Sequence, residues 1–224
     1  MKSKRLQRKL KRMLTFVTTT TLLLTSILTP GVTVLASTKN NDVPKFSPAN
    51  KNLRNVMYYG DWSIWGGQGN FYPNGIPADQ LTHLNFAFLD FDANGNLIFT
   101  DKDAAIGAPV GMDGVQWGAA NAGILSALQD LRASNPNLKV GVSIGGWSKS
   151  GDFTAVAKDA SIRAKFVDNV MKFIKYTNMD FVDVDWEYPV FVREGDTVDN
   201  QNDEGTPHSI PSDKENYILL LQDL

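Results

Sequence analysis

The stretch MDFVDVDWEYP, residues 179–189, is apolar enough for a buried strand, yet it contains four carboxylates. Side chains alternate between the two faces of a strand, so Asp183, Asp185 and Glu187 lie on one face. Asp180 is out of step with this acidic row, and the opposite face is apolar. The pattern predicts a strand that packs one face on helices and directs its acids toward a barrel interior or a cleft.

Neighbouring acids in the row lie about 6.5–7 Å apart along the strand, so their carboxyl groups can meet and titrate together. Burial of three unpaired anions would cost several kcal/mol, so we expect at least one to be protonated near neutrality and able to donate a proton. The alternative is an ion-paired or metal-bound acidic strand. Few cations and no histidine lie close in sequence, which disfavours that alternative.

Short β-rich runs alternate with helical patterns along the rest of the chain. Apolar residues at helical spacing predict helices around 124–131 and 166–174 and over Lys214–Leu224. The alternation fits either an open doubly wound sheet or half of a closed eight-stranded barrel. The absence of a GxGxxG after the first run argues against a nucleotide-binding sheet. Strands are predicted at residues 55–60, 83–91, 138–144 and 181–186.

A short polar segment, residues 92–96, separates two β-rich runs, Phe91 at the end of one and 97–99 in the other. Asn94-Gly95 is typical of a tight hairpin turn. A calcium loop is the alternative, but the spacing of its oxygen ligands would be wrong. We therefore predict a hairpin here.

The N-terminus has the pattern of a secretory signal. Seven basic residues fall within the first 12 positions, and residues 13–36 carry no charge. Val34 and Ala36 precede Ser37 as a signal peptidase requires, so we predict a signal peptide over 1–36, an exposed linker over 37–52 and a fold from 53. A membrane anchor is the alternative, but threonines, a proline and a glycine make this segment a poor spanning helix.

Cleavage after Ala36 would leave 15 of the 22 basic residues against 24 acidic ones, a net charge of −9. Such an acidic protein is a poor partner for nucleic acid or anionic membranes, so we expect a neutral substrate and no membrane association after cleavage. The chain has no cysteine, which excludes disulfides and thiolate chemistry. We expect no metal or other cofactor, and a monomer.

Two motifs resemble one known family. Residues 180–187, DFVDVDWE, match the D-x-x-D-x-D-x-E signature of glycoside hydrolase family 18, and residues 143–147, SIGGW, resemble its S-x-G-G motif on the preceding strand. The segment 81–88 is similar to the family's second strand. The resemblance runs from about Asn55 to Leu224 and is greatest to bacterial chitinases of the A type. Phe181 stands where the family often has glycine.

The resemblance implies a (β/α)8 TIM barrel, of which residues 53–224 would form about the first four β/α units. We therefore expect a fragment or truncated chain, whose activity alone is doubtful. It further implies a secreted, extracellular chitinase that hydrolyses β-1,4-linked N-acetylglucosamine polymers with retention of configuration. The substrate's own acetamido oxygen would be the nucleophile.

The resemblance also implies roles for individual residues. Glu187 would be the general acid, and Asp185 would stabilise the N-acetyl group of the substrate. Asp183 would keep Asp185 protonated or correctly turned, with support from Ser143. Asp180 would be structural.

Aromatic side chains near the predicted strand ends are candidates for sugar platforms, because the apolar faces of pyranose rings bury well on flat rings. Such residues are more often part of the core, but proximity to the matched motifs favours Trp62 and Trp147. His83, one of two histidines that are far apart in the sequence, is interpreted as structural. The expected substrate-binding set is Tyr58, Trp62, Gly146, Trp147 and Tyr188.

Three further interpretations stay open. The acidic segment Arg193–Gly205 is most simply a solvated insertion, although it could line the cleft. A non-catalytic chitin-binding lectin on the same fold is a second hypothesis, disfavoured by the presence of Glu187. An endo-N-acetylglucosaminidase or peptidoglycan hydrolase of the same family is a third.

Overall fold

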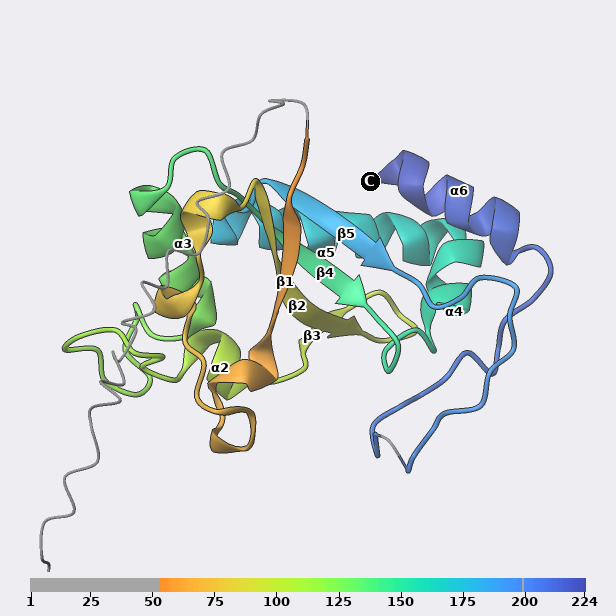
Figure 1. Ribbon diagram of the computed structural model, residues 1–224. Coiled ribbons are helices and arrows are strands. Elements are labelled where there is room, and N and C mark those ends of the chain that lie inside the picture. The colour runs from red at the N-terminus through yellow and green to blue at the C-terminus, as the bar shows by residue number, and fades with distance from the viewer. Residues whose placement is uncertain (1–52, 199) are drawn as a thin grey trace, which may run out of the picture. The chain divides into compact units, whose positions relative to one another are not determined.

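The computed structural model describes residues 53–198 and 200–224. The predicted signal peptide and linker lie outside these residues. Parallel strands form the centre of the described part in the order β1-β2-β4-β5 (Figure 1), with a short β3 paired antiparallel to β2. The strands are β1 (Val56–Gly60), β2 (His83–Phe91), β3 (Leu97–Phe99), β4 (Lys139–Gly145) and β5 (Phe181–Asp185). All four predicted parallel strands are confirmed.

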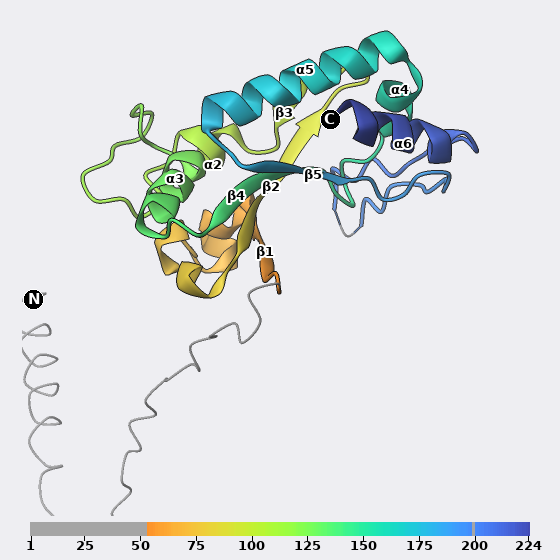
Figure 2. The ribbon, with the colours of Figure 1, turned by 90° about the horizontal axis from the view of Figure 1, so that it is seen from above.

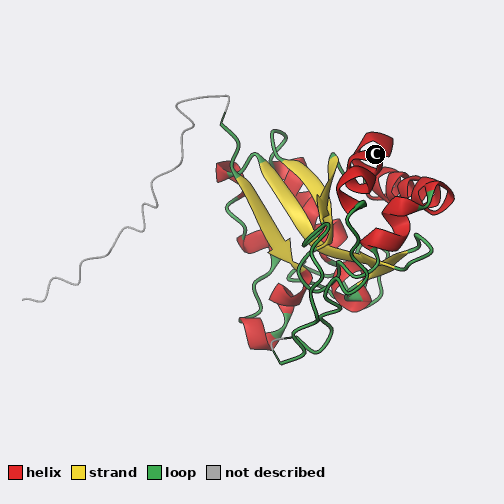
Figure 3. Ribbon diagram, turned by 90° about the vertical axis from the view of Figure 1, so that its right-hand side faces the viewer, coloured by secondary structure: helices red, strands yellow, loops and turns green. Residues whose placement is uncertain are grey.

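Helices pack against one face of this sheet, as Figure 2 shows for α3 and α5 and Figure 3 shows with the strands in yellow. The α-helices are α2 (Lys102–Ile106), α3 (Ile124–Ser134), α4 (Phe153–Lys158), α5 (Ala160–Thr177) and α6 (Asp213–Asp223). Helices α3, α5 and α6 confirm the three predicted helices. The β1–β2 connection holds four 3-10 helices, so the first unit departs from a regular strand-helix repeat: η1 (Asp61–Ile64), η2 (Gly66–Gln68), η3 (Pro73–Gly75) and η4 (Ala78–Gln80).

The predicted hairpin is present between β2 and β3. Leu89 pairs with Phe99 and Phe91 with Leu97. One oxygen of Asp92 accepts hydrogen bonds from the backbone N–H groups of Asn94 and Asn96, both at 2.9 Å. Gly95 takes a φ of 76°, which explains why glycine suits this turn. The oxygens of Asp92 are thus used to close a turn.

The core lies between the sheet and its helices. Phe91 of β2 contacts Phe153 of α4 and Phe166 of α5, with ring centroids 4.5 and 5.0 Å apart. Trp186, directly after β5, stacks on Phe153 at 5.2 Å. This apolar layer lies immediately behind the acidic row and fixes the strand that carries it.

Truncation of Phe166 to alanine is expected to lower the free energy of unfolding by about 3–5 kcal/mol, because this ring is fully buried and its removal leaves a cavity. Urea denaturation followed by circular dichroism measures the change. Tyr176→Ala on the same helix is the matched control: Tyr176 is 91% exposed, so its loss should cost no more than about 0.5 kcal/mol. Equal destabilisation by the two variants would contradict this assignment of the core.

The departure at Phe181 is accommodated by its neighbours. Phe181 is paired with Gly141 of β4, and a Cβ on Gly141 would collide with the Phe181 ring. The ring also meets His83 edge-on, with centroids 5.4 Å apart. Gly141 on β4 has no side chain and therefore leaves room for the Phe181 ring on β5. His83 packs against that ring, as expected of a structural residue.

Candidate active site

The acidic row lies at the carboxyl end of β5, as its alternation predicted. Asp183 is paired with Ser143 of β4, Asp185 with Gly145, and Glu187 follows the strand. Trp186 points to the opposite face, where it is 4% exposed. The row is partly rather than fully buried, because the described helices cover only the other face of the sheet.

Three donors from three different strands converge on one oxygen of Asp183. The hydroxyls of Tyr58 and Ser143 each donate to Oδ2 at 2.8 Å, and the Asn85 amide donates to it at 3.3 Å. These bonds hold the Asp183 carboxyl in one orientation and satisfy it as an acceptor. Asn85 is only 2% exposed, and neither motif pointed to it.

Asp185 is the perturbed member of the row. Burial, the charges of Glu187 and Asp183, and a side-chain hydrogen bond with Glu187 together raise the pKa of Asp185 to about 6. Its carboxyl therefore keeps a proton to far higher pH than an ordinary aspartate. The raised pKa agrees with the expected coupling of the acids, but a pKa of about 6 leaves Asp185 mostly ionised at neutrality, where a protonated member of the row was expected.

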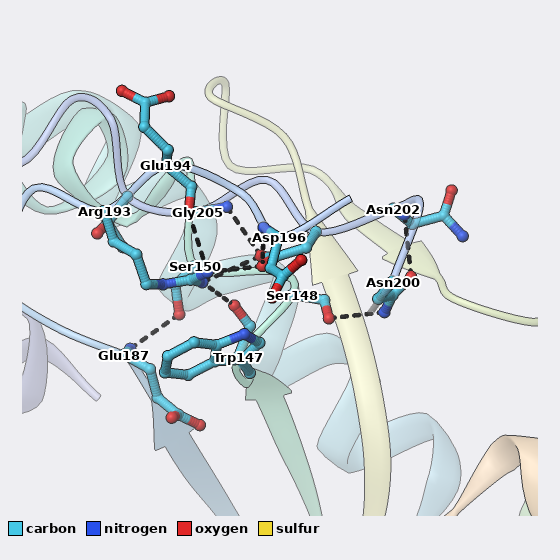
Figure 4. A network of polar contacts seen from close by, with 12 residues as sticks. Trp147, Ser148, Ser150, Glu187, Arg193, Glu194, Asp196, Asn200, Asn202 and Gly205 are labelled. Atoms are coloured by element: carbon cyan, nitrogen blue, oxygen red, sulfur yellow. Dashed lines mark hydrogen bonds and ion pairs between the residues drawn. The ribbon is translucent and has the colours of Figure 1, made fainter. Parts of the chain in front are cut away.

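Glu187 is positioned through its backbone. Its N–H donates to the Ser150 hydroxyl at 2.9 Å, and Ser150 in turn donates to the carbonyl oxygen of Gly146 at 2.9 Å. Ser150 is buried, and no feature of the sequence set it apart from other serines. The loop after β4 is thereby fastened to the residue that follows the acidic strand (Figure 4).

Gly146 acts through its backbone in this loop. Its φ is 81°, and a Cβ there would lie 3.0 Å from the ring of Phe88. Its N–H donates to the carbonyl oxygen of Asp185 at 2.7 Å. Both constraints favour glycine and bring the S-x-G-G segment against the acidic strand.

Trp62 and Trp147 line one pocket of about 460 Å³ beside the acidic strand. Trp62 is 48% exposed and stacks on Phe88 at 6.2 Å, and Trp147 is 44% exposed. Asn200 and Asn202 of the long β5–α6 connection also line this pocket. The arrangement offers flat apolar surfaces with polar groups at the margin, as a sugar site requires.

The two tyrosines predicted to bind substrate have different neighbours. Tyr58 reaches the acidic row rather than the open end of the strand, and burial together with its bond to Asp183 raises the pKa of Tyr58 to about 12. Tyr188 lies edge-on to Trp147 at 6.5 Å. A side-chain hydrogen bond with Glu187 raises the pKa of Tyr188.

Asp180 lies apart from the row, immediately before β5. It accepts a hydrogen bond from the backbone N–H of Val140 at 2.9 Å and pairs with Arg132 at 3.1 Å and Lys139 at 3.2 Å. Burial opposes the charged form, but these three donors lower the pKa of Asp180 overall. Its contacts join β5 to β4 and α3.

Asp61 is a buried acid that sequence reasoning did not select. It follows β1, is 4% exposed, and accepts a hydrogen bond from Thr100. Burial raises the pKa of Asp61 to about 6. It lines the same pocket as Trp62 and Trp147, at the base of that aromatic surface.

Among the described residues, no group of three or more histidine, cysteine or acidic side chains is arranged to hold a metal ion. In the same part of the chain, no helix combines the length and apolar character that a membrane span needs. The row itself presents carboxylates in contact with the Tyr58 hydroxyl, and Trp62 and Trp147 present aromatic faces in the pocket described above.

A parallel α/β sheet with acids at the carboxyl end of one strand is the arrangement found at the active-site end of (β/α)8 barrel enzymes. Residues 54–224 match the model for glycosyl hydrolases family 18, and the chain belongs to that family. It is 31% identical to chitinase A1 of Niallia circulans over 206 residues, which cover 80% of this chain and 28% of that protein. The chain thus spans about a third or less of the curated relatives it matches.

Solved structures agree on the fold. Chitinase ChiA74 from Bacillus thuringiensis superposes with a TM-score of 0.63 at 27% identity, covering 76% of this chain and 31% of that one. A Group IV chitinase of Ostrinia furnacalis, solved with allosamidin, gives 0.58 at 30% identity, covering 75% and 38%. The described strands and helices form the first part of a (β/α)8 barrel, as the resemblance implied.

Proposed function

We propose that this protein hydrolyses chitin or chitin oligomers by a retaining, substrate-assisted mechanism. The observation that carries the proposal is the row Asp183-Asp185-Glu187 on and directly after β5, in which Tyr58, Asn85 and Ser143 hold the Asp183 carboxyl and the pKa of Asp185 is raised to about 6. Carboxylates with raised pKa values beside other acids are typical of glycosidase active sites. Family membership and the similarity to chitinases support the same substrate.

In the proposed reaction, Glu187 donates a proton to the glycosidic oxygen as the bond from that oxygen to the anomeric carbon breaks. The carbonyl oxygen of the substrate's 2-acetamido group attacks the same carbon, so no enzyme nucleophile is needed. Asp185, beside Glu187, stabilises the positive charge that develops on the acetamido group. Glu187 then takes a proton from the attacking water, which restores the acid and retains the configuration.

Asp183 and its three donors position Asp185 in this scheme. Tyr58, Ser143 and Asn85 donate to one oxygen of Asp183 and fix its carboxyl two residues before Asp185, and the Asp183 charge contributes to the raised pKa of Asp185. Trp62 and Trp147 are proposed to receive the apolar faces of sugar rings. Gly146 and Tyr188 complete the proposed substrate-binding set, with Gly146 acting through its backbone.

The substrate requirement gives a direct test. Purified protein, prepared as its gene encodes it, should cleave chitin oligomers but not cello-oligosaccharides, which share the β-1,4 linkage and lack the acetamido nucleophile. Product separation measures cleavage, and proton NMR of the first products should show the β-anomer. Binding of chitin oligomers without cleavage would instead favour the lectin hypothesis. Cleavage of N-glycans or peptidoglycan in preference to chitin would favour the third one.

We also propose that the protein acts outside the cell. Support comes from the basic start, the uncharged segment 13–36 and the small residues before Ser37. N-terminal sequencing of protein recovered from the culture medium should give Ser37 as the first residue. Recovery of the uncleaved chain in the membrane fraction would favour an anchor.

A further inference from the structure

The connection between β5 and α6 folds back onto the loop after β4. Thr206 N–H donates to the Arg193 carbonyl oxygen at 2.8 Å, which closes the segment 193–206 on itself. Glu204 N–H donates to the Ser148 carbonyl oxygen at 3.1 Å, and the Asn200 amide donates to the Ser148 hydroxyl at 2.7 Å. We call residues 193–206 the β5–α6 insertion. Its contacts show a built structure rather than the solvated segment that its composition favours.

An ion pair lies at the centre of the β5–α6 insertion. The guanidinium of Arg193 donates to both oxygens of Asp203, at 2.6 and 3.0 Å, and the Asp203 side chain has no exposed surface. The backbone N–H groups of Asp196 and Gly205 donate to the same carboxyl at 2.7 and 2.9 Å. The bonds from Arg193, followed by those from the backbone, lower the pKa of Asp203 to about 2. Asp203 therefore holds the guanidinium as a fixed bidentate partner.

The guanidinium held in this way covers one face of Trp147. Its central carbon lies 3.9 Å from the ring centroid, and Arg193 Nη2 also donates to the Trp147 carbonyl oxygen. Figure 4 shows Arg193 over the indole, with Glu187 on the neighbouring strand end. Trp147 nevertheless stays 44% exposed and lines the pocket that Trp62 shares. Arg193 thus contacts both the side chain and the backbone of the proposed platform.

We propose that Arg193, anchored by Asp203, is a positioning residue that fixes Trp147 as a sugar platform before substrate binds. This inference rests on the proposed function. A half-exposed indole on a loop would otherwise lose side-chain freedom on binding, and immobilisation beforehand removes that cost. A guanidinium stacked on one face leaves the other face to receive a sugar ring. The β5–α6 insertion is then a device for substrate affinity.

Kinetics on chitin oligomers separate this role from a general structural one. Arg193→Ala is expected to raise KM about tenfold with kcat changed by less than about twofold, because the platform and not the proton transfer is affected. Trp147→Ala should raise KM at least as much, and the double variant should be no worse than Trp147→Ala alone. Arg193→Lys keeps the charge without the bidentate fork and should fall between wild type and Arg193→Ala.

Glu204→Gln is the matched control within the insertion. It removes the 2.8 Å ion pair with Lys149 and does not touch Trp147, so KM should stay within about twofold of wild type. If KM rises as much in Glu204→Gln as in Arg193→Ala, then any loosening of the β5–α6 insertion is enough to raise KM. That result would overturn the specific role proposed for Arg193. Additive effects of Arg193→Ala and Trp147→Ala would likewise overturn the proposal.

A second measurement needs no substrate. Acrylamide should quench tryptophan fluorescence more strongly in Arg193→Ala than in wild type, and this difference should vanish in a Trp147→Phe background. Equal quenching in folded wild type and Arg193→Ala would refute the positioning role. Wild-type protein that neither binds nor cleaves chitin oligomers would refute the proposed function. Weaker binding in Trp147→Ala with Arg193→Ala unaffected would refute only the role of Arg193.

Discussion

Glu187→Gln is expected to lower kcat/KM on chitin oligomers by on the order of 10²-fold or more, because the amide has no proton to give to the departing oxygen. The substitution keeps the size of the side chain, and the backbone bond from Glu187 to Ser150 does not depend on the carboxyl. Folding and substrate binding should therefore persist. Initial rates by product separation, together with oligomer affinity by isothermal titration, measure the two quantities.

The matched control for this variant is Glu215→Gln in the first turn of α6, an exposed glutamate remote from the row. It should leave kcat/KM within about twofold of wild type. Turnover by Glu187→Gln at the wild-type rate would exclude Glu187 as the general acid. Loss of oligomer binding along with turnover would indicate a disrupted site instead of a missing proton.

Asp185→Asn is expected to lower kcat by about 10²- to 10³-fold and to remove a feature of the pH profile. Stabilisation of positive charge on the acetamido group requires the ionised form of Asp185, and because the pKa of Asp185 is raised to about 6, that form is present above that pH and is lost as the pH falls through it. Wild-type activity should therefore decline below about pH 6. An asparagine stays neutral throughout, so the residual activity should not show this decline.

Rates from pH 4 to 9 in overlapping buffers test this expectation. Asp168→Asn is the control: Asp168 lies on α5 in an exposed pair with Lys172, and its loss should change neither the rate nor the profile. If the activity of Asp185→Asn declines at the same pH and to the same extent as that of wild type, the decline is due to another titrating group.

The fold was largely predictable because its signals are local. Each parallel strand is a short β-rich run, and each long helix shows apolar residues at helical spacing, since both periods are set by backbone geometry. The β1–β2 connection was not predictable in the same way. Its 3-10 helices are too short to show a period, so no apolar repeat marks them.

The candidate site was predictable only where its members share a strand or a motif. Asp183, Asp185 and Glu187 follow from alternation, whereas Asn85, Ser150 and Asp61 do not. Asn85 lies 98 residues from Asp183, and Ser150 lies 37 from Glu187. No local pattern relates residues so distant in sequence, because their contact depends on the register of the strands between them.

The sequence by itself determined the acidic row, its direction along the strand and the position of Glu187 at its end, because alternation of side chains is a property of any extended chain. Only the tertiary structure decided which donors meet Asp183, why the pKa of Asp185 is raised, and that Arg193 lies on Trp147. Those features depend on burial and on contacts between strands and loops far apart in sequence. They arise when the sheet register places β1, β2, β4 and β5 side by side in that order and the β5–α6 insertion folds back onto the loop after β4.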